Sequence, residues 1–355
     1  MTRRAPSRAK YGTWALGLAG TVVLISACGS ANLDAGSDHP QGPLPVDERN
    51  PVIVSNDGPY DNWQGELAMT MASSGQMQLA GIVVNATANY PSIDSNMKGW
   101  RAMAAAARAS GMRNIPDPIA SIAPLLQRPA DGNIDETSPN RSEGALLILD
   151  TAGRLSRPLR PIVVATGGEL TDIADAYLID HSVIDRVVVV SSLGHTLGHI
   201  EKIIAGGEAY ALQTTAGAIM NSPNGELDPW ADEIVARKFR YVQVNAYYDQ
   251  RNDITPALVA QLPANPFGAW MTSKLSTLFP SNVGADQNSV IASIFPLFAL
   301  DFFRASAGSS PPSAGQVPTL PSAPGGNNWI VPRGDNAAAT ARFWQALKDP
   351  STFGR

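Results

Sequence analysis

The sequence predicts an α/β fold in which a mostly parallel sheet is covered by helices on both faces. Short β-branched runs alternate with Ala- and Leu-rich segments of helical length through the middle of the chain. Most of the short runs are apolar at consecutive positions, as strands buried on both faces must be. Sheets of this kind bind ligands beyond the carboxyl ends of their strands. We therefore expect the chemistry to lie in the strand-to-helix loops.

Five short runs are predicted as strands and four longer segments as helices. The strands are Pro51 to Asn56, Leu79 to Asn85, Pro161 to Thr166, Arg186 to Ser191 and Tyr241 to Asn245. The helices are Glu66 to Ser74, Asn96 to Ser110, Leu170 to Ile179 and Pro229 to Arg237. Gly75 and Gly111 directly follow the first two helices, where a left-handed C-cap is favoured.

The first 27 residues have the build of a secretory signal that ends at Cys28, the only cysteine. Basic residues come first, an apolar run from Trp14 to Ile25 follows, and small residues precede the cysteine. Ile25 to Cys28 resembles the lipobox of bacterial lipoproteins, in which the cysteine is lipidated after cleavage. The alternative is a buried cysteine behind a plain membrane anchor. We expect an exported lipoprotein of the cell envelope, held at the membrane by a lipid on Cys28.

The remaining chain is predicted to hold one domain, over residues 51 to 355. Residues 28 to 50 contain little to bury and are predicted to be a flexible tether. A Pro-, Ser- and Gly-rich insert is expected at about residues 306 to 328. Beyond it, apolar residues at helical spacing around Phe343, Trp344 and Leu347 predict a packed terminal helix.

Composition and missing motifs exclude several classes of function. With 31 acidic and 26 basic residues the formal charge is −5, so we expect no nucleic acid partner. The sequence contains no G-x-G-x-x-G after the first strand, no phosphate-binding P-loop and no G-x-S-x-G elbow. Nucleotide binding and serine hydrolase chemistry therefore lack their usual signals. Whether the chain forms a homo-oligomer stays open.

Oxygen-bearing side chains crowd the loop after the first predicted strand. This loop, Ser55 to Asn62, has the sequence SNDGPYDN. Oxygen ligands in one loop at the carboxyl end of a strand suit a hard cation such as Ca²⁺. The alternative is a helix-capping turn, because Asp and Asn are common in turns for backbone reasons.

Four blocks, in the right order along residues 51 to 290, resemble the nucleoside hydrolases. PVIVSNDGPYDN stands where the family has a strand ending in D-x-D-x-x-x-D-D, and LAGIVVN followed by Ala88 to Pro91 resembles its next strand and Gly-Asn-Val-Pro loop. PIVVATGGELTDIADAYLIDHSVIDRVVVVSS is the most specific block and carries one extra residue, Glu169. Asn224 to Pro229 keeps an Asn four positions before Asp-Pro, and Gly284 to Gln287 stands where His-Asp is usual. The resemblance implies a nucleoside hydrolase-like, Rossmann-like sheet.

The resemblance also implies a calcium-dependent hydrolase that cleaves N-glycosidic bonds in ribonucleosides or a related glycoside. Asp57 matches the family's central Asp, which binds calcium and acts as base towards the attacking water. The implied calcium ligands are Asp57, Asn62, the Thr166 backbone carbonyl and Asp286. The implied sugar-binding residues are Asp61, Asn89 and Asn224. These residue types suit the reaction, because an oxocarbenium-like transition state needs nearby carboxylates and a firmly held sugar.

Four positions depart from the family's pattern. They are Ser55 at the first Asp, Asn62 at a charged calcium ligand, Ser222 at a sugar-binding Glu and Ala285 at the His linked to leaving-group protonation. Fewer charged ligands should weaken calcium binding, because ligand charge tunes affinity. Glu66 and Glu169 are candidates to compensate.

Histidines and tryptophans near the matched blocks have ordinary as well as functional explanations. His195 is a candidate general acid in place of the missing histidine. The alternatives are a zinc site shared with His199 and, more simply, capping or surface histidines. For the tryptophans at positions 63, 100 and 230 core packing is the default and base stacking the alternative.

Two other functions compete with the hydrolase. The first is a non-catalytic lipoprotein that binds a sugar or nucleoside through a degraded hydrolase site. The second is a structural lipoprotein of the envelope, which no ligand would protect against heat. Substitution of Asp57 separates the first from an enzyme, because a binder shows no turnover before or after the change.

Overall fold

The computed structural model describes the chain in several segments, all within one compact unit, His39–Arg355. The described residues are 50–60, 63–158, 160–192, 227–244, 257, 260–277, 327–331 and 344–354. The predicted signal, tether and Pro-rich insert lie outside them, except for Asn50 and the two asparagines that begin the last strand. None of the helices in these segments is long and apolar enough to cross a membrane.

A seven-stranded sheet with strand order β3-β2-β1-β4-β5-β6-β7 forms the centre of the described chain. The strands are β1 Pro51–Asn56, β2 Gln78–Val84, β3 Pro118–Ala120, β4 Ile162–Thr166, β5 Val187–Ser192, β6 Arg240–Val244 and β7 Asn327–Val331. Every neighbouring pair is parallel. The chain winds outward from β1 to β3, returns to β4 beside β1, and then winds the other way. The carboxyl ends of β1 and β4 therefore form the topological switch point, where such sheets bind ligands.

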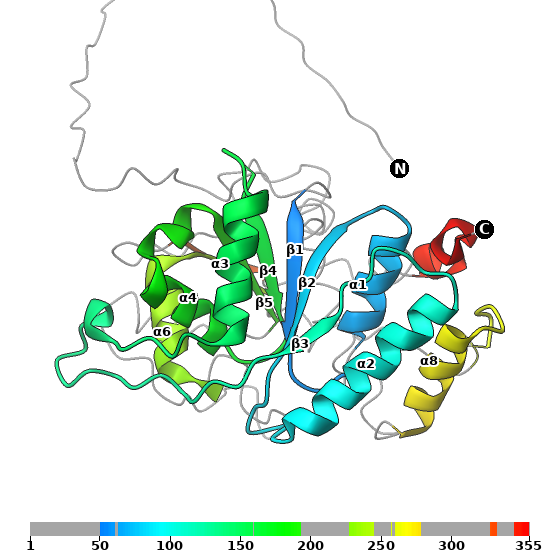
Figure 1. Ribbon diagram of the computed structural model, residues 1–355, viewed down its shortest axis with the longest axis horizontal. Helices are drawn as coiled ribbons and strands as arrows, with labels where there is room; N and C mark the ends of the chain where they lie inside the picture. Colours follow the sequence, from blue (N-terminus) through cyan, green and yellow to red (C-terminus); the bar gives the residue numbers. More distant parts are fainter. Residues whose placement is uncertain are drawn as a thin grey trace, which may run out of the picture. The chain divides into compact units, whose positions relative to one another are not determined.

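Helices cover both faces of this sheet, so the predicted α/β architecture is confirmed (Figure 1). One face carries α1 Gln64–Ser73, α2 Ile93–Ala109 and α8 Pro266–Thr277, and the other carries α3 Glu143–Leu155, α4 Thr171–Ile179 and α6 Pro229–Lys238. Three short 3₁₀ helices are η1 Ile134–Glu136, η2 His181–Asp185 and η4 Pro350–Phe353.

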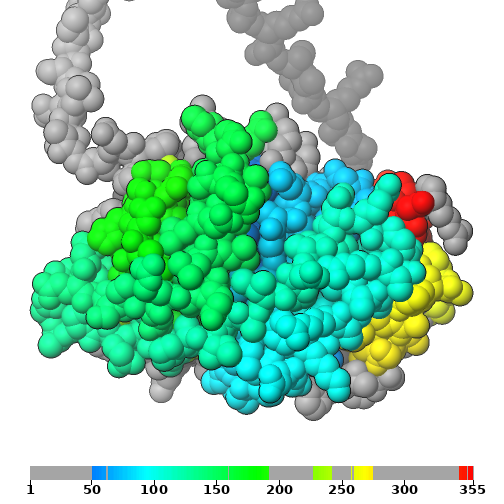
Figure 2. Space-filling view, in the orientation of Figure 1, coloured from blue at the N-terminus to red at the C-terminus, as the bar shows by residue number. Residues whose placement is uncertain are grey.

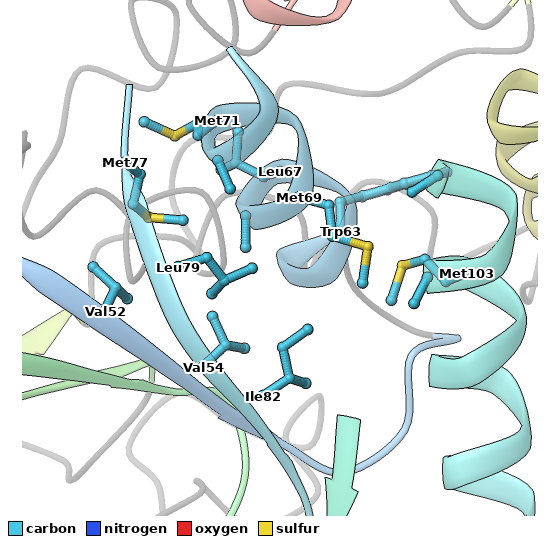
Figure 3. Close-up of a cluster of buried hydrophobic side chains, with 14 of the residues drawn as sticks. Val52, Val54, Trp63, Leu67, Met69, Met71, Met77, Leu79, Ile82 and Met103 are labelled. Atoms are coloured by element: carbon cyan, nitrogen blue, oxygen red, sulfur yellow. The ribbon is translucent and has the colours of Figure 1, made fainter. Parts of the chain in front are cut away.

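Alternate residues of β1, β4 and β5 enter two different cores. Val52 and Val54 of β1 pack with Leu67 of α1 in the first core, which Figure 3 shows, whereas Ile53 packs in the second. Both faces of the sheet are thus dry, which is why the strands are apolar at consecutive positions. Trp63 and Trp100 are fully buried in the first core, and Trp230 is buried in the second. Core packing is therefore confirmed for all three.

The five predicted strands are observed within about one residue of their expected ends. Two strands were not predicted: β3 is only three residues long and begins with proline, and β7 starts inside the expected insert at Asn327. Helices α3 and α8 were also missed, although Ser142 is an N-cap whose side chain accepts a hydrogen bond from the Ala145 amide. Gly75 and Gly111 have positive φ angles, as their C-cap positions predict. Residues 344–348 form the terminal helix, with Trp344 and Leu347 buried in the first core.

A buried ion pair joins α1 to α8. Helix α8 packs beside α2 (Figure 2). Lys274 Nζ lies 2.8 Å from Glu66 Oε1, and both side chains are almost fully buried. The Nε1 atom of Trp270 donates to the same Glu66 oxygen at 2.8 Å. Lys274 Nζ also lies 4.5 Å from the centre of the Trp63 ring, within range of a cation–π contact. Two segments more than two hundred residues apart are thereby held together at the start of α1.

Lys274→Met is expected to lower the free energy of unfolding by about 3–5 kcal/mol, because it leaves the Glu66 carboxylate buried without its cation. Urea unfolding measures the loss. The matched control is Arg154→Met, which breaks the exposed Asp150–Arg154 pair of 2.7 Å and should cost far less, because solvent screens an exposed pair. Equal losses in the two variants would show that burial of the pair is unimportant.

Candidate functional site

Asp57 lies directly after β1 and its carboxylate is fixed from two loops. Asp57 is 4% exposed; its Oδ1 accepts from the Gly58 amide at 2.6 Å and its Oδ2 from the Thr87 hydroxyl at 2.6 Å. Its backbone carbonyl accepts from Trp100 Nε1 at 3.0 Å. The carboxylate is therefore held in one orientation at the carboxyl edge of β1, by two uncharged hydrogen-bond donors.

The loop after β4 lies against the Asp57 loop. Ser55 of β1 and Thr166 of β4 are register partners, and the Gly167 amide donates to the Ser55 carbonyl at 2.9 Å. A β-carbon added at Gly168 would lie 3.3 Å from the Asp57 nitrogen and 2.8 Å from Asn85 Oδ1. Consecutive glycines thus let the two loops touch. The structure thus places Asp57 and Thr166 at the same carboxyl rim of the sheet, as the predicted shared cation site requires.

Glu169 follows these glycines and its side chain is almost completely buried. Burial, together with the nearby charges of Asp172, Asp228 and Asp57, raises the pKa of Glu169 to about 9. No basic side chain among the described residues forms an ion pair with it. The rim of the sheet therefore concentrates acidic groups with no basic partner among the described residues, and without a cation Glu169 holds a proton at neutral pH.

The other acidic side chains here have structural partners that sequence reasoning missed. Asp228 is the N-cap of α6, and its Oδ2 accepts from the Leu126 amide and the Thr171 hydroxyl. Asp172 accepts from the Ser121 hydroxyl at 2.6 Å. Burial raises the pKa of both carboxyls. Only the Asp-Pro sequence at position 228 signalled one of these roles, because it is typical of a helix N-terminus.

The outcome for the predicted substrate residues is mixed. Asn89 is exposed in the loop after β2, and it is Thr87 of this loop, not Asn89, whose side chain contacts Asp57. Thr87 was missed because a single hydroxyl in a loop carries no sequence signal. The remaining predicted site residues lie outside the described residues: Asp61, Asn62, His195, Asn224, Asp286 and the lipidation residue Cys28. The same holds for His199, Ser222 and Ala285.

The described part of the site suits a hard cation in its chemistry. Its donors are all oxygens: the Asp57 carboxylate, the Thr166 backbone position and the side-chain oxygen of Asn85. Asn85 Oδ1 is buried and has no hydrogen-bond donor. Within the described segments no three His, Cys, Asp or Glu side chains form a metal-binding group. These residues therefore fit part of a calcium shell, which needs further oxygen ligands to be complete.

The fold is shared with solved nucleoside hydrolases. The inosine-uridine preferring nucleoside hydrolase from Bacillus anthracis is 13% identical, with a TM-score of 0.53 over 86% of this chain and 99% of that one. A plant nucleoside hydrolase is 12% identical, with a TM-score of 0.50 over 85% and 100% of the chains. The purine-preferring ribonucleoside hydrolase from Gardnerella vaginalis is 15% identical, with a TM-score of 0.48 over 85% and 98%. No protein-family model matches the sequence, and no curated protein matches it either. At such identities the likeness establishes the fold.

Glu169 is expected to make stability pH-dependent when divalent cations are removed by a chelator. Its carboxyl binds a proton up to about pH 9 in the folded protein but only to about 4.5 once exposed. Between these values the folded state holds more protons, so its contribution to stability is complete below pH 4.5 and falls as pH rises towards 9. Urea unfolding from pH 5 to 9 should show a decline that Glu169→Gln makes shallower. Parallel profiles for the two proteins would contradict this.

Trp100→Phe is expected to loosen the Asp57 loop by removing the hydrogen bond to its carbonyl, at a cost of about 1–3 kcal/mol. Hydrogen exchange of the Gly58 amide should accelerate. Trp230→Phe is the control, since it loses a similar bond, from Nε1 to the Thr137 hydroxyl at 2.9 Å, in the other core. If Trp230→Phe accelerates Gly58 exchange equally, the effect is global instability and not loss of local support.

Proposed function

We propose that the protein is a calcium-dependent hydrolase of N-glycosidic bonds in ribonucleosides or a related glycoside. One observation carries the proposal: a buried, oriented Asp57 carboxylate lies at the switch point of a nucleoside hydrolase-like sheet, against the loop after β4. Sheets of this topology bind their ligands at that point. Solved proteins that share this fold include nucleoside hydrolases, which supports the choice of glycosidic bond over other bonds.

The proposed reaction needs a base, a held sugar and charge near the anomeric carbon. Calcium, when bound, would orient a water molecule and lower its pKa. Asp57 would accept a proton from the attacking water, and its two hydrogen bonds hold the carboxylate in position for that role. Carboxylates at this rim would favour the positive charge that develops on the sugar as the N-glycosidic bond breaks. In this proposal Asp61, Asn89 and Asn224 bind the sugar hydroxyls, and His195 is the acid for the leaving group.

A second candidate is a binding protein with a degraded site, and Ser55 favours it. At this position, where the resemblance places an Asp, the structure has a buried hydroxyl that accepts from Asn85 Nδ2 at 3.4 Å. The rim therefore has one carboxylate fewer than a complete hydrolase site. A binder of this kind would hold the same sugar or nucleoside without cleaving it.

We also propose that the protein is exported and anchored to the membrane of the cell envelope by a lipid on Cys28. The signal-like residues 1 to 27 and the lone cysteine support this. Metabolic labelling with a fatty acid analogue tests it: Cys28→Ser should lose both the label and the membrane fraction. Retention of the protein in membranes without the label would favour a plain anchor.

Asp57→Asn is expected to abolish turnover, by at least about 100-fold, because it removes the base and keeps the shape. The assay is release of free ribose from a panel of nucleosides with calcium present. Thermal unfolding of the chelated protein should stay close to that of the parent, which shows that the fold survives. Ligand-dependent heat stabilisation without ribose release from the parent would instead support the binding protein.

A further inference from the structure

Glu169 and Glu66 are the two acidic residues that could replace the charge missing at Asn62, and the structure gives them different surroundings. Glu66 is fully buried on α1, and its Oε1 is bound by Lys274 Nζ and Trp270 Nε1. Its negative charge is therefore neutralised between α1 and α8. Glu169 is just as buried, but it lies on the loop after β4 and forms no ion pair with any described residue.

The carboxylates around Glu169 cannot stabilise it. Asp228 is engaged at the start of α6 by two backbone amides and the Thr171 hydroxyl. Asp172 is packed against Gly144 at the start of α3, where an added β-carbon would overlap its carboxylate. Both have a structural use, whereas Glu169 has a hydrogen bond with the Thr171 side chain and no cationic partner among the described residues. A buried charge of this kind persists when a cation compensates it.

A buried oxygen without a hydrogen-bond donor lies where the loop after β4 meets the Asp57 loop. Asn85 is 1% exposed, and its Oδ1 has no donor. This atom faces Gly168, at the seam where the loop after β4 meets the Asp57 backbone. A buried acceptor without a donor costs about 1–3 kcal/mol. A cation bound at the seam would give this oxygen a partner.

We propose that the Glu169 carboxylate and the Asn85 side-chain oxygen belong to the cation-binding set at Asp57, and that Glu169 supplies the charge absent at Asn62. The inference rests on the proposed function, because it takes calcium as the cation. Carboxylate and amide oxygens are ligands that calcium accepts, and the number of charged ligands sets its affinity. Glu169, the extra residue in the Gly-Gly-Glu-Leu-Thr segment, thus has a role as a cation ligand in this proposal.

Calorimetric titration of the full-length protein with calcium chloride tests the proposal. Glu169→Gln should weaken calcium binding by about 10- to 100-fold, and the heat stabilisation that calcium gives should shrink with it. Glu66→Gln is the matched control, since it also neutralises a buried glutamate. It should lower stability in the absence of calcium but leave calcium affinity unchanged. Glu136→Gln, at an exposed position, controls for loss of charge alone.

A charge-rescue variant keeps the test decisive. Asn85→Asp added to Glu169→Gln should recover calcium affinity in part, because it restores a carboxylate at the same cation. Equal calcium affinity in the parent and Glu169→Gln, or equal weakening in Glu66→Gln, would overturn the inference. Weakened calcium binding in Glu169→Gln together with no ribose release from any nucleoside would uphold it and reject the proposed hydrolase. A parent protein that binds no calcium would reject both.

Discussion

The contact between the loops that follow β1 and β4 is the constraint on which the site depends. The two strands are neighbours only because the chain reverses its winding direction at this point. Gly167 and Gly168 then allow a backbone approach that a β-carbon would block. Without this approach Asp57, Thr166 and Asn85 would not share a rim, and the oxygen donors would be scattered over separate loops. The fold therefore creates the site by bringing backbones together before any side chain acts.

Negative charge is the second feature that organises this rim. Burial raises the pKa of Glu169, Asp172 and Asp228, and for Glu169 the neighbouring carboxylates raise it further. A structure in which several buried carboxyls repel one another is stabilised by protons or by a cation. Two of the three offset the cost through hydrogen bonds that fasten α3, α4 and α6. The third carboxyl, that of Glu169, is the one that we propose as a cation ligand.

The two buried glutamates show how the same residue type takes opposite roles. Glu66 meets Lys274 and Trp270, and Lys274 in turn lies over the Trp63 ring, so the charge of Glu66 serves the packing of α8 against α1. Glu169 lies near Asp172, Asp228 and Asp57 and has no basic partner among the described residues, so its carboxyl remains available to a cation. The difference arises from what each loop or helix packs against. Because the two residues are of the same type, their different positions in the folded chain decide these roles.

The sequence by itself determined the α/β class, five strands, both glycine C-caps and the Asp57 loop, because hydrophobic periodicity and turn chemistry are local. It did not find β3, which is too short to carry a pattern, or β7, which follows a Pro-rich stretch. Only the tertiary structure decided that the Thr87 hydroxyl contacts the Asp57 carboxylate. The same is true of Glu169, since its surroundings come from α4, α6 and β1. Contacts between distant segments depend on strand order and loop approach, and no local pattern encodes them.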